Sequence, residues 1–166
     1  MNYDLILVML PHSHFIVGFL FGVVGWKLGF IQPFDILIIA ILAVLIDIDH
    51  YIHYIIKHKD FNIIKTWNNG ATKKEYQKTF IHHLSGIAII VQLIFVLIWF
   101  NPRFGYIALA AYMSHMLLDY ICMIDKHLVE YKYVNIKGIM IPWNFGQEVV
   151  FMMAALISLI FMVAWI

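Results

Sequence analysis

Two groups of ionisable residues lie inside otherwise apolar segments of this chain. Asp47, Asp49 and His50 close one segment, and His115 and Asp119 lie four residues apart in another. On a helix, residues three or four positions apart share a face, so each group can present an imidazole beside a carboxylate. These two kinds of ligand together suit zinc, manganese, iron or nickel. We therefore expect the two groups to meet around one or two divalent metal ions, with zinc preferred.

The apolar surroundings make a metal ion a better explanation than an ion pair. An aspartate near the middle of a membrane costs about 2.5–3.5 kcal/mol, so the three at positions 47, 49 and 119 together cost roughly 8–10 kcal/mol. A divalent ion bound by protein ligands returns on the order of 10 kcal/mol or more. A salt bridge would need basic partners at the same depth, and the apolar segments offer only Lys27, which we expect at the opposite face. A metal ion with an open coordination position also activates water for hydrolysis.

The composition is typical of an integral membrane protein. The 166 residues are 63% hydrophobic and 13% charged, whereas ordinary globular domains contain about 25% charged residues. The length suits one bundle without a second soluble domain. A formal net charge of +1 excludes a nucleic-acid binder that relies on bulk charge. The amino end lacks the basic start of a cleavable signal, so we expect it to be retained.

Five apolar segments approach the roughly 20 residues that a spanning helix needs. We expect helices over His14–Ile31, Pro33–Ile56, Leu84–Phe100, Arg103–Met123 and Gln147–Ile166. The predicted fold class is therefore all-α, a single transmembrane domain over residues 1–166 with about five spanning helices. Glycines four residues apart in the first segment predict close packing between helices.

Basic residues predict the orientation in the cytoplasmic membrane. A polar, lysine-rich loop at about residues 57–83 and the loop that precedes Gln147 carry most of the lysines, whereas the other face has only Lys27 and Arg103. Because cytoplasmic loops are enriched in Lys and Arg, we expect both loops and the amino end inside and the carboxyl end outside. This topology brings ionisable side chains from all five helices to one depth near the cytoplasmic surface.

The candidate site follows from that convergence. The expected metal ligands are His14, Asp47, Asp49, His50, His83, His115 and Asp119. His14 either binds the ion or orients a ligand. We assign His82 and Glu148 to catalysis, Glu148 as a general base, although either His82 or His83 could take the ligand position. On a regular helix Asp47 and Asp49 point about 160° apart, so one of them orients a ligand or the helix loosens there.

These motifs, in this order, resemble a family of small bacterial and archaeal proteins described as membrane-bound metal-dependent hydrolases, typified by the LexA-regulated inner-membrane protein. The matching segments are His14–Gly18, Leu45–His50, Ser114–Asp119 and, loosely, Ile139–Pro142. Phe80–Ser85 departs from the family pattern, because it lacks the His-Arg-Gly-x-Thr-His-Ser form. The resemblance covers nearly the whole chain and implies a hydrolase that depends on a divalent metal ion.

The resulting functional hypothesis is hydrolysis of a lipid or lipid-linked ester or phosphoester, because the site lies at the lipid boundary. A membrane lipid is then the expected partner. One alternative is a transporter of protons or metal ions, since chains of His and Asp also serve as relays. The few polar residues in the outer half of the helices count against it. The other is a non-catalytic metal-binding or haem-binding protein. Hydrogen bonds between helices, or a polar helix end facing water, would account for the same residues without an ion.

Overall fold

The computed structural model describes residues 11–72, 80–124 and 133–142, together with positions 154, 157, 158 and 161. Its helices are α1 (Pro11–Lys27), α2 (Asp35–Leu45), α3 (Ile48–His58), α4 (Ile63–Thr72), α5 (Leu84–Phe100) and α6 (Pro102–Ile124). A 3-10 helix, η1 (Phe80–His82), precedes α5. Two short strands, β1 (Tyr133–Ile136) and β2 (Ile139–Pro142), form an antiparallel hairpin that was not predicted. The described chain is predominantly helical, which confirms the expected α class.

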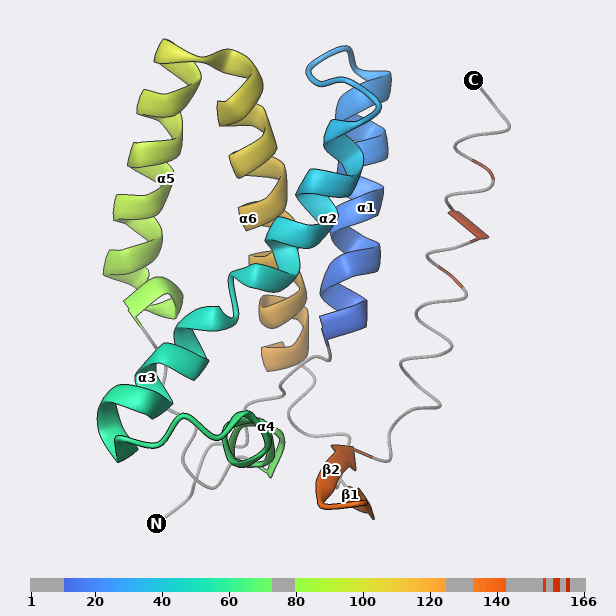
Figure 1. The fold of residues 1–166 in the computed structure, drawn as a ribbon. Coiled ribbons are helices and arrows are strands. Elements are labelled where there is room, and N and C mark those ends of the chain that lie inside the picture. Colours follow the sequence, from blue (N-terminus) through green and yellow to red (C-terminus); the bar gives the residue numbers. More distant parts are fainter. Residues whose placement is uncertain are drawn as a thin grey trace.

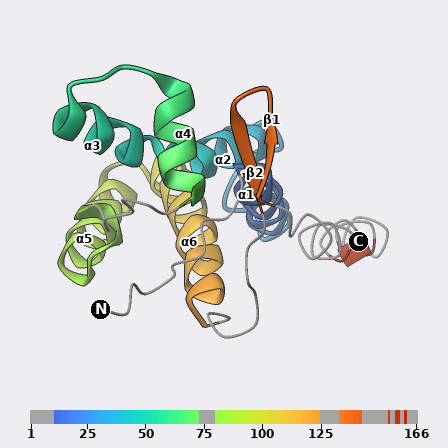
Figure 2. The same cartoon turned by 90° about the horizontal axis from the view of Figure 1, so that it is seen from below.

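Four helices stand side by side, and α3 and α4 lie across one end of the group (Figure 1). The central member is α6, which contacts α1, α2 and α5. The view from below shows α3 and α4 over the same end (Figure 2). Since α6 carries His115 and Asp119, its central position lets side chains from α1, the α2–α3 break and η1 contact them.

Helices α1 and α2 approach closely because glycines face the contact. A Cβ atom on Gly18 would lie 2.8 Å from the Cβ atom of Ala43, and one on Gly22 would lie 2.9 Å from the Cα atom of Ile36. The packing predicted from the glycine spacing is therefore confirmed. His14 lies one turn before Gly18 on the same face of α1, so this contact also sets His14 against the carboxyl end of α2.

The segment predicted as one helix over Pro33–Ile56 is broken into α2 and α3, so that prediction needs correction. Helix α2 ends at Leu45, and Ile46 and Asp47 form a turn before α3 begins at Ile48. In this turn the amide of Asp47 donates to the carbonyl of Val44, 3.3 Å away. The break changes the direction in which Asp47 points relative to the residues of α3.

An ion pair joins α2 and α6 at the opposite end of the molecule. Arg103 Nη2 lies 2.7 Å from Asp35 Oδ1, and Arg103 Nε lies 2.9 Å from Asp35 Oδ2. The backbone amide of Gln32 donates to the same carboxylate. Asp35 is buried and Arg103 is partly exposed. This bidentate ion pair holds the starts of α2 and α6 next to each other.

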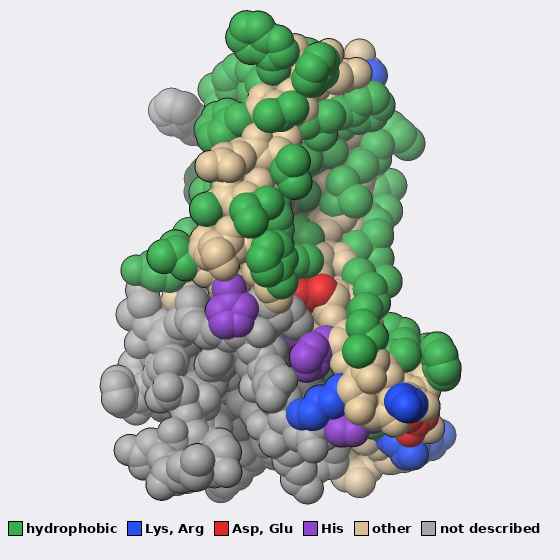
Figure 3. All heavy atoms as spheres, turned by 90° about the vertical axis from the view of Figure 1, so that its left-hand side faces the viewer, with side chains coloured by type: hydrophobic (Ala, Val, Ile, Leu, Met, Phe, Trp, Pro, Cys, Tyr) green, Lys and Arg blue, Asp and Glu red, His purple; other side chains and the backbone are tan. Residues whose placement is uncertain are grey.

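The apolar side chains divide between a small core and a large exposed surface. The buried apolar side chains include a contiguous cluster of Ile31, Ile39, Ile107 and Ala111. Large apolar side chains on α5, such as Leu93 and Trp99, remain exposed, Trp99 by 85%. On the face drawn in Figure 3, many apolar side chains are exposed along the helices, whereas most of the visible lysine, histidine and acidic side chains lie toward the end near α3.

Length and composition mark one stretch among the described residues as able to cross a membrane. It is Asp35–His58, which covers α2 and α3. Helix α5 is apolar but has 17 residues. Four of the five predicted segments are helical, and Gln147–Ile166 lies outside the described residues apart from four positions. A bundle of five spans therefore stays a prediction.

Candidate metal centre

The side chains predicted to converge lie together at the end of the bundle nearest α3. They come from the start of α1, the break between α2 and α3, the first turn of α3, η1 and the second half of α6: His14, Asp47, Asp49, His50, His82, His115 and Asp119. His115 Nε2 lies 3.5 Å from Asp47 Oδ1 and 3.3 Å from Asp119 Oδ2. The predicted proximity of these two aspartates is therefore confirmed.

Three atoms at the centre of this cluster form a nearly equilateral triangle. His82 Nε2 lies 3.2 Å from His115 Nε2 and 3.1 Å from Asp119 Oδ2. The third side, from His115 Nε2 to Asp119 Oδ2, is 3.3 Å. Tetrahedral ligands that lie 2.0–2.2 Å from one zinc ion are separated from each other by roughly 3.3–3.6 Å. The triangle therefore has close to the dimensions of one face of a metal coordination shell.

Both imidazoles are held from behind by oxygen atoms. His115 Nδ1 lies 2.8 Å from the carbonyl oxygen of Ala43. A carbonyl oxygen only accepts, so Nδ1 carries the proton and Nε2 presents its lone pair to the triangle. His82 Nδ1 lies 3.5 Å from Asp49 Oδ2. Imidazoles that bind metal ions are commonly oriented by such acceptors.

Asp47 and His50 form the edge of the cluster. His50 Nε2 lies 3.9 Å from Asp47 Oδ1 and 3.9 Å from Asp49 Oδ1. The two aspartates therefore contact the same cluster, although a regular helix would point them apart. The break at Asp47 is the loosening that was one of the two expected alternatives. Asp49, whose contacts are with two imidazoles, also fits the other alternative, in which it orients ligands.

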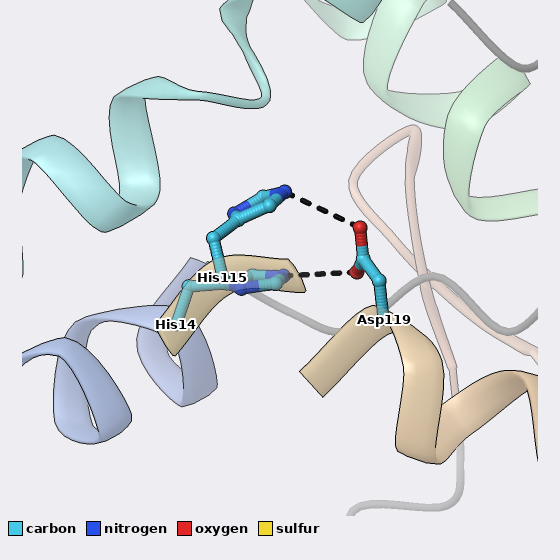
Figure 4. A group of neighbouring side chains, drawn as sticks. All are labelled: His14, His115 and Asp119. Carbon is cyan, nitrogen blue, oxygen red and sulfur yellow. Dashed lines mark ion pairs between the residues drawn. The ribbon is translucent and has the colours of Figure 1, made fainter. Parts of the chain in front are cut away.

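His14 lies against His115. Its ring stacks on the His115 ring with the centroids 4.1 Å apart. Figure 4 shows both rings pointing toward the carboxylate of Asp119, His14 toward one oxygen and His115 toward the other. His14 and His115 are both buried. Buried imidazoles aimed at a carboxylate form a site that is closed on this side.

The carboxylates also determine the charge of His82, which lies outside the long helices. Burial lowers the pKa of this imidazole, but its contacts with Asp119 and Asp49 outweigh that effect and raise the pKa to about 9. At neutral pH and without a metal ion, His82 therefore carries a proton that partly neutralises the carboxylates. A metal ion bound to His82 Nε2 would have to displace that proton.

The structure places His82, and not His83, in the cluster, which favours His82 of the two expected alternatives for the ligand position. His82 was assigned to catalysis and His83 to metal binding, yet His82 lies in the triangle and His83 is exposed outside the cluster. The physical reason is local. His82 ends the 3-10 turn, whereas His83 is extended, with φ −83° and ψ 147°, at the start of α5. Glu148, the predicted general base, lies outside the described residues.

Two groups that support the site had not been identified from the sequence. The carbonyl oxygen of Ala43 orients His115, and no sequence pattern marks a backbone group of this kind. The hydroxyl of Tyr112 donates to the carbonyl of Ile81, 3.1 Å away, and so fixes the turn that carries His82. Tyr112 lies three residues before His115 on the same face of α6. That spacing was a signal that could have linked the tyrosine to the site.

The comparisons with known proteins leave the family open. No family model matches the chain, and neither a curated protein nor a solved structure matches it. The resemblance to membrane-bound metal-dependent hydrolases therefore stays a prediction.

Proposed function

We propose that this protein is an integral membrane hydrolase that uses a divalent metal ion, preferably zinc, to cleave an ester or phosphoester of a membrane lipid or lipid-linked substrate. The observation that carries the proposal is the triangle formed by His82 Nε2, His115 Nε2 and Asp119 Oδ2, with sides of 3.1–3.3 Å. Two nitrogens and one oxygen at this spacing would supply three of the four ligands of a typical zinc ion.

The donor set favours a metal ion over a network of hydrogen bonds alone. A proton on His82 Nε2 can form a hydrogen bond to Asp119 or to His115. It does little to neutralise the negative charge of the other carboxylates in the cluster. Unpaired charges in a low-dielectric environment are costly. A divalent ion compensates two negative charges at once and accepts lone pairs from all three corners of the triangle.

The surface supports a location in the membrane. Most of the apolar side chains on the outer faces of α5 and α6 are not covered by other described residues; examples are Leu93, Phe95 and Trp99. An exposed apolar area of this kind is typical of a lipid contact or a protein interface. Charged residues concentrate at the two ends of the helices, as expected where helices leave the lipid.

The neighbourhood of the cluster supports a substrate with apolar chains. Ile48 follows Asp47 directly and is half exposed, and Leu117 and Tyr120 flank Asp119 with exposed side chains. A water-soluble substrate would gain nothing from these side chains. A lipid could lie along them with its ester or phosphate beside the carboxylates.

The bound ion would supply an activated water molecule and stabilise negative charge on the substrate. The chain's own residues would divide the remaining tasks. His82, His115 and Asp119 would hold the ion, while Asp49 and the Ala43 carbonyl would orient the two imidazoles. His50 is partly exposed at the edge of the cluster, so it could accept a proton and release it to solvent.

The first test is the substitution Asp119→Ala. Asp119 contacts three imidazoles of the cluster, so its loss should abolish stoichiometric metal binding in protein purified in detergent, as measured by elemental analysis. Hydrolysis of a panel of phospholipids and lipid-linked esters should fall with the metal content. The matched control is Asp60→Ala, because Asp60 pairs with Lys65 outside the cluster.

Two results would contradict the proposal. Wild-type metal content in the Asp119→Ala protein would show that the metal ion is not bound at the proposed site. Full metal content without hydrolysis of any lipid in the panel would show that the protein binds metal, and it would contradict the hydrolase activity. If Asp119→Ala fails to reach the membrane, His115→Gln tests the same triangle with a smaller change.

A further inference from the structure

We infer that the cluster holds two divalent ions, and that Asp47 and Asp119 bridge them. The first ion would occupy the triangle already described. The second would be bound by His14 Nε2 together with the carboxylate oxygens that face away from His115. The inference goes beyond the proposed function, which needs only one ion.

The carboxylate of Asp119 is divided between two imidazoles. Its Oδ2 atom lies 3.3 Å from His115 Nε2, and its Oδ1 atom lies 3.7 Å from His14 Nε2 (Figure 4). Carboxylates that bridge two ions present one oxygen to each ion. The Asp119 carboxylate has this arrangement with respect to His14 and His115.

The carboxylate of Asp47, in the break between α2 and α3, also presents one oxygen to each of the two imidazoles. Its Oδ1 atom lies 3.5 Å from His115 Nε2, and its Oδ2 atom lies 3.7 Å from His14 Nε2. Two carboxylates on different elements therefore each place one oxygen near His14 and the other near His115. One carboxylate could do so by accident of its rotamer, but two such divisions define two adjacent ligand sets.

The separation of the two imidazoles fits a pair of ions. The rings of His14 and His115 stack with their centroids 4.1 Å apart and their planes inclined by 20°. Both Nε2 atoms point toward the carboxylate of Asp119 (Figure 4), so ions in front of the two stacked rings would be separated by a similar distance. Two-metal hydrolytic sites have ions about 3.5–4 Å apart.

Hydrogen bonding does not account for the position of His14. Its Nε2 atom is 3.7 Å from both carboxylates, which is longer than the N–H···O distances of about 2.7–3.2 Å in proteins. Two ligands that lie about 2.1 Å from one ion are 3.7 Å apart when they subtend roughly 120° at it. His14 is only 1% exposed, and its Nδ1 atom has no hydrogen-bond partner among the described residues. A buried imidazole with so few partners is well explained as a metal ligand.

The test is the number of ions per chain. Detergent-purified protein would be stripped with a chelator, reloaded with Mn²⁺ and measured by elemental analysis and electron paramagnetic resonance. Wild-type protein should bind two ions per chain and give the spectrum of a spin-coupled pair. His14→Gln should bind one ion and give the signal of an isolated Mn²⁺. Asp119→Ala should bind none, because it removes a ligand of both ions.

The control is His58→Gln, because His58 is exposed and its ring lies against Tyr54. This variant should keep two coupled ions. One ion per chain in wild-type protein, or an unchanged coupled pair in His14→Gln, would overturn the second site and leave the first. No bound ion in wild-type protein would overturn both this inference and the proposed function. If His14→Gln does not fold, the wild-type stoichiometry and coupling decide.

Discussion

The two imidazoles of the triangle each use both ring nitrogens. His115 donates from Nδ1 to the carbonyl of Ala43, and His82 turns its Nδ1 atom toward Asp49. Such contacts set which nitrogen faces the ion and in which direction the ring points. Asp49 was expected among the ligands, but its contacts indicate that it acts through His82. Its role would then be to position His82 rather than to bind the ion.

This role predicts the effect of Asp49→Asn. The amide holds His82 less strongly than the carboxylate does, so metal affinity should fall by about 10–100-fold. The number of ions at saturating metal should stay unchanged. Competition with a chromophoric chelator would measure the affinity, and Asp60→Asn is the control, since Asp60 contacts Lys65 far from the cluster. A lower number of ions at saturation would make Asp49 a ligand, and wild-type affinity would remove its positioning role.

At the scale of elements, two features bring the ligands together. The break at Asp47 lets Asp47 contact His115 of α6, while Asp49 in the first turn of α3 contacts His82. The glycine contact between α1 and α2 sets His14 beside Asp47, because Gly18 faces Ala43, His14 lies four residues before Gly18, and Asp47 lies four residues after Ala43. The second ligand set therefore depends on this helix contact.

That dependence predicts the outcome of Gly18→Leu. The new side chain would overlap Ala43, since even a Cβ atom would lie 2.8 Å from the Ala43 Cβ atom. Forcing extra volume into a packed contact costs about 1–3 kcal/mol. We expect a lower melting temperature and the loss of one bound ion, because α1 would carry His14 away from Asp47. The control is Gly25→Ala, whose Cβ would meet only the side chain of Ile31, at 3.3 Å. Two ions in Gly18→Leu would show that the contact does not position His14.

At the scale of the whole molecule, the two ends differ in chemistry. The cluster lies at the end covered by α3 and α4 (Figure 1). The far end is joined by Asp35 and Arg103, which are paired with each other. Among the described residues, the ionisable groups do not form a chain from one end to the other. This arrangement gives no support to the alternative of a proton or ion transporter.

The lysine distribution predicts which end faces the cytoplasm, and cysteine labelling can test it. In a Cys122→Ser background, single cysteines would replace exposed Gln32, before α2, and exposed His58, at the end of α3. A maleimide that does not cross membranes should label Gln32→Cys in intact cells and His58→Cys only after the inner face is opened. The opposite pattern would invert the orientation. Labelling of both from one side would show that α2 and α3 together do not span.

Part of the candidate site could be read from residue types alone. Charged groups are costly in apolar helices, so the aspartates at positions 47 and 119 required a shared explanation, and their proximity follows from the expected topology. The helical segments could be predicted because long apolar runs leave few alternatives. The turn at Ile46–Asp47 was harder to establish, since the spacing of Asp47 and Asp49 left open whether the helix loosens there or one aspartate orients a ligand.

Other features depended on the tertiary structure. Whether His82 or His83 joins the cluster depends on the backbone angles of a single residue at the start of α5. The division of each carboxylate between His14 and His115 depends on how closely α1, α2 and α6 pack. A sequence pattern indicates which environment a side chain prefers, but it does not give the exact position of that side chain. Metal ligation requires positions accurate to a few tenths of an ångström, which only contacts between distant segments provide.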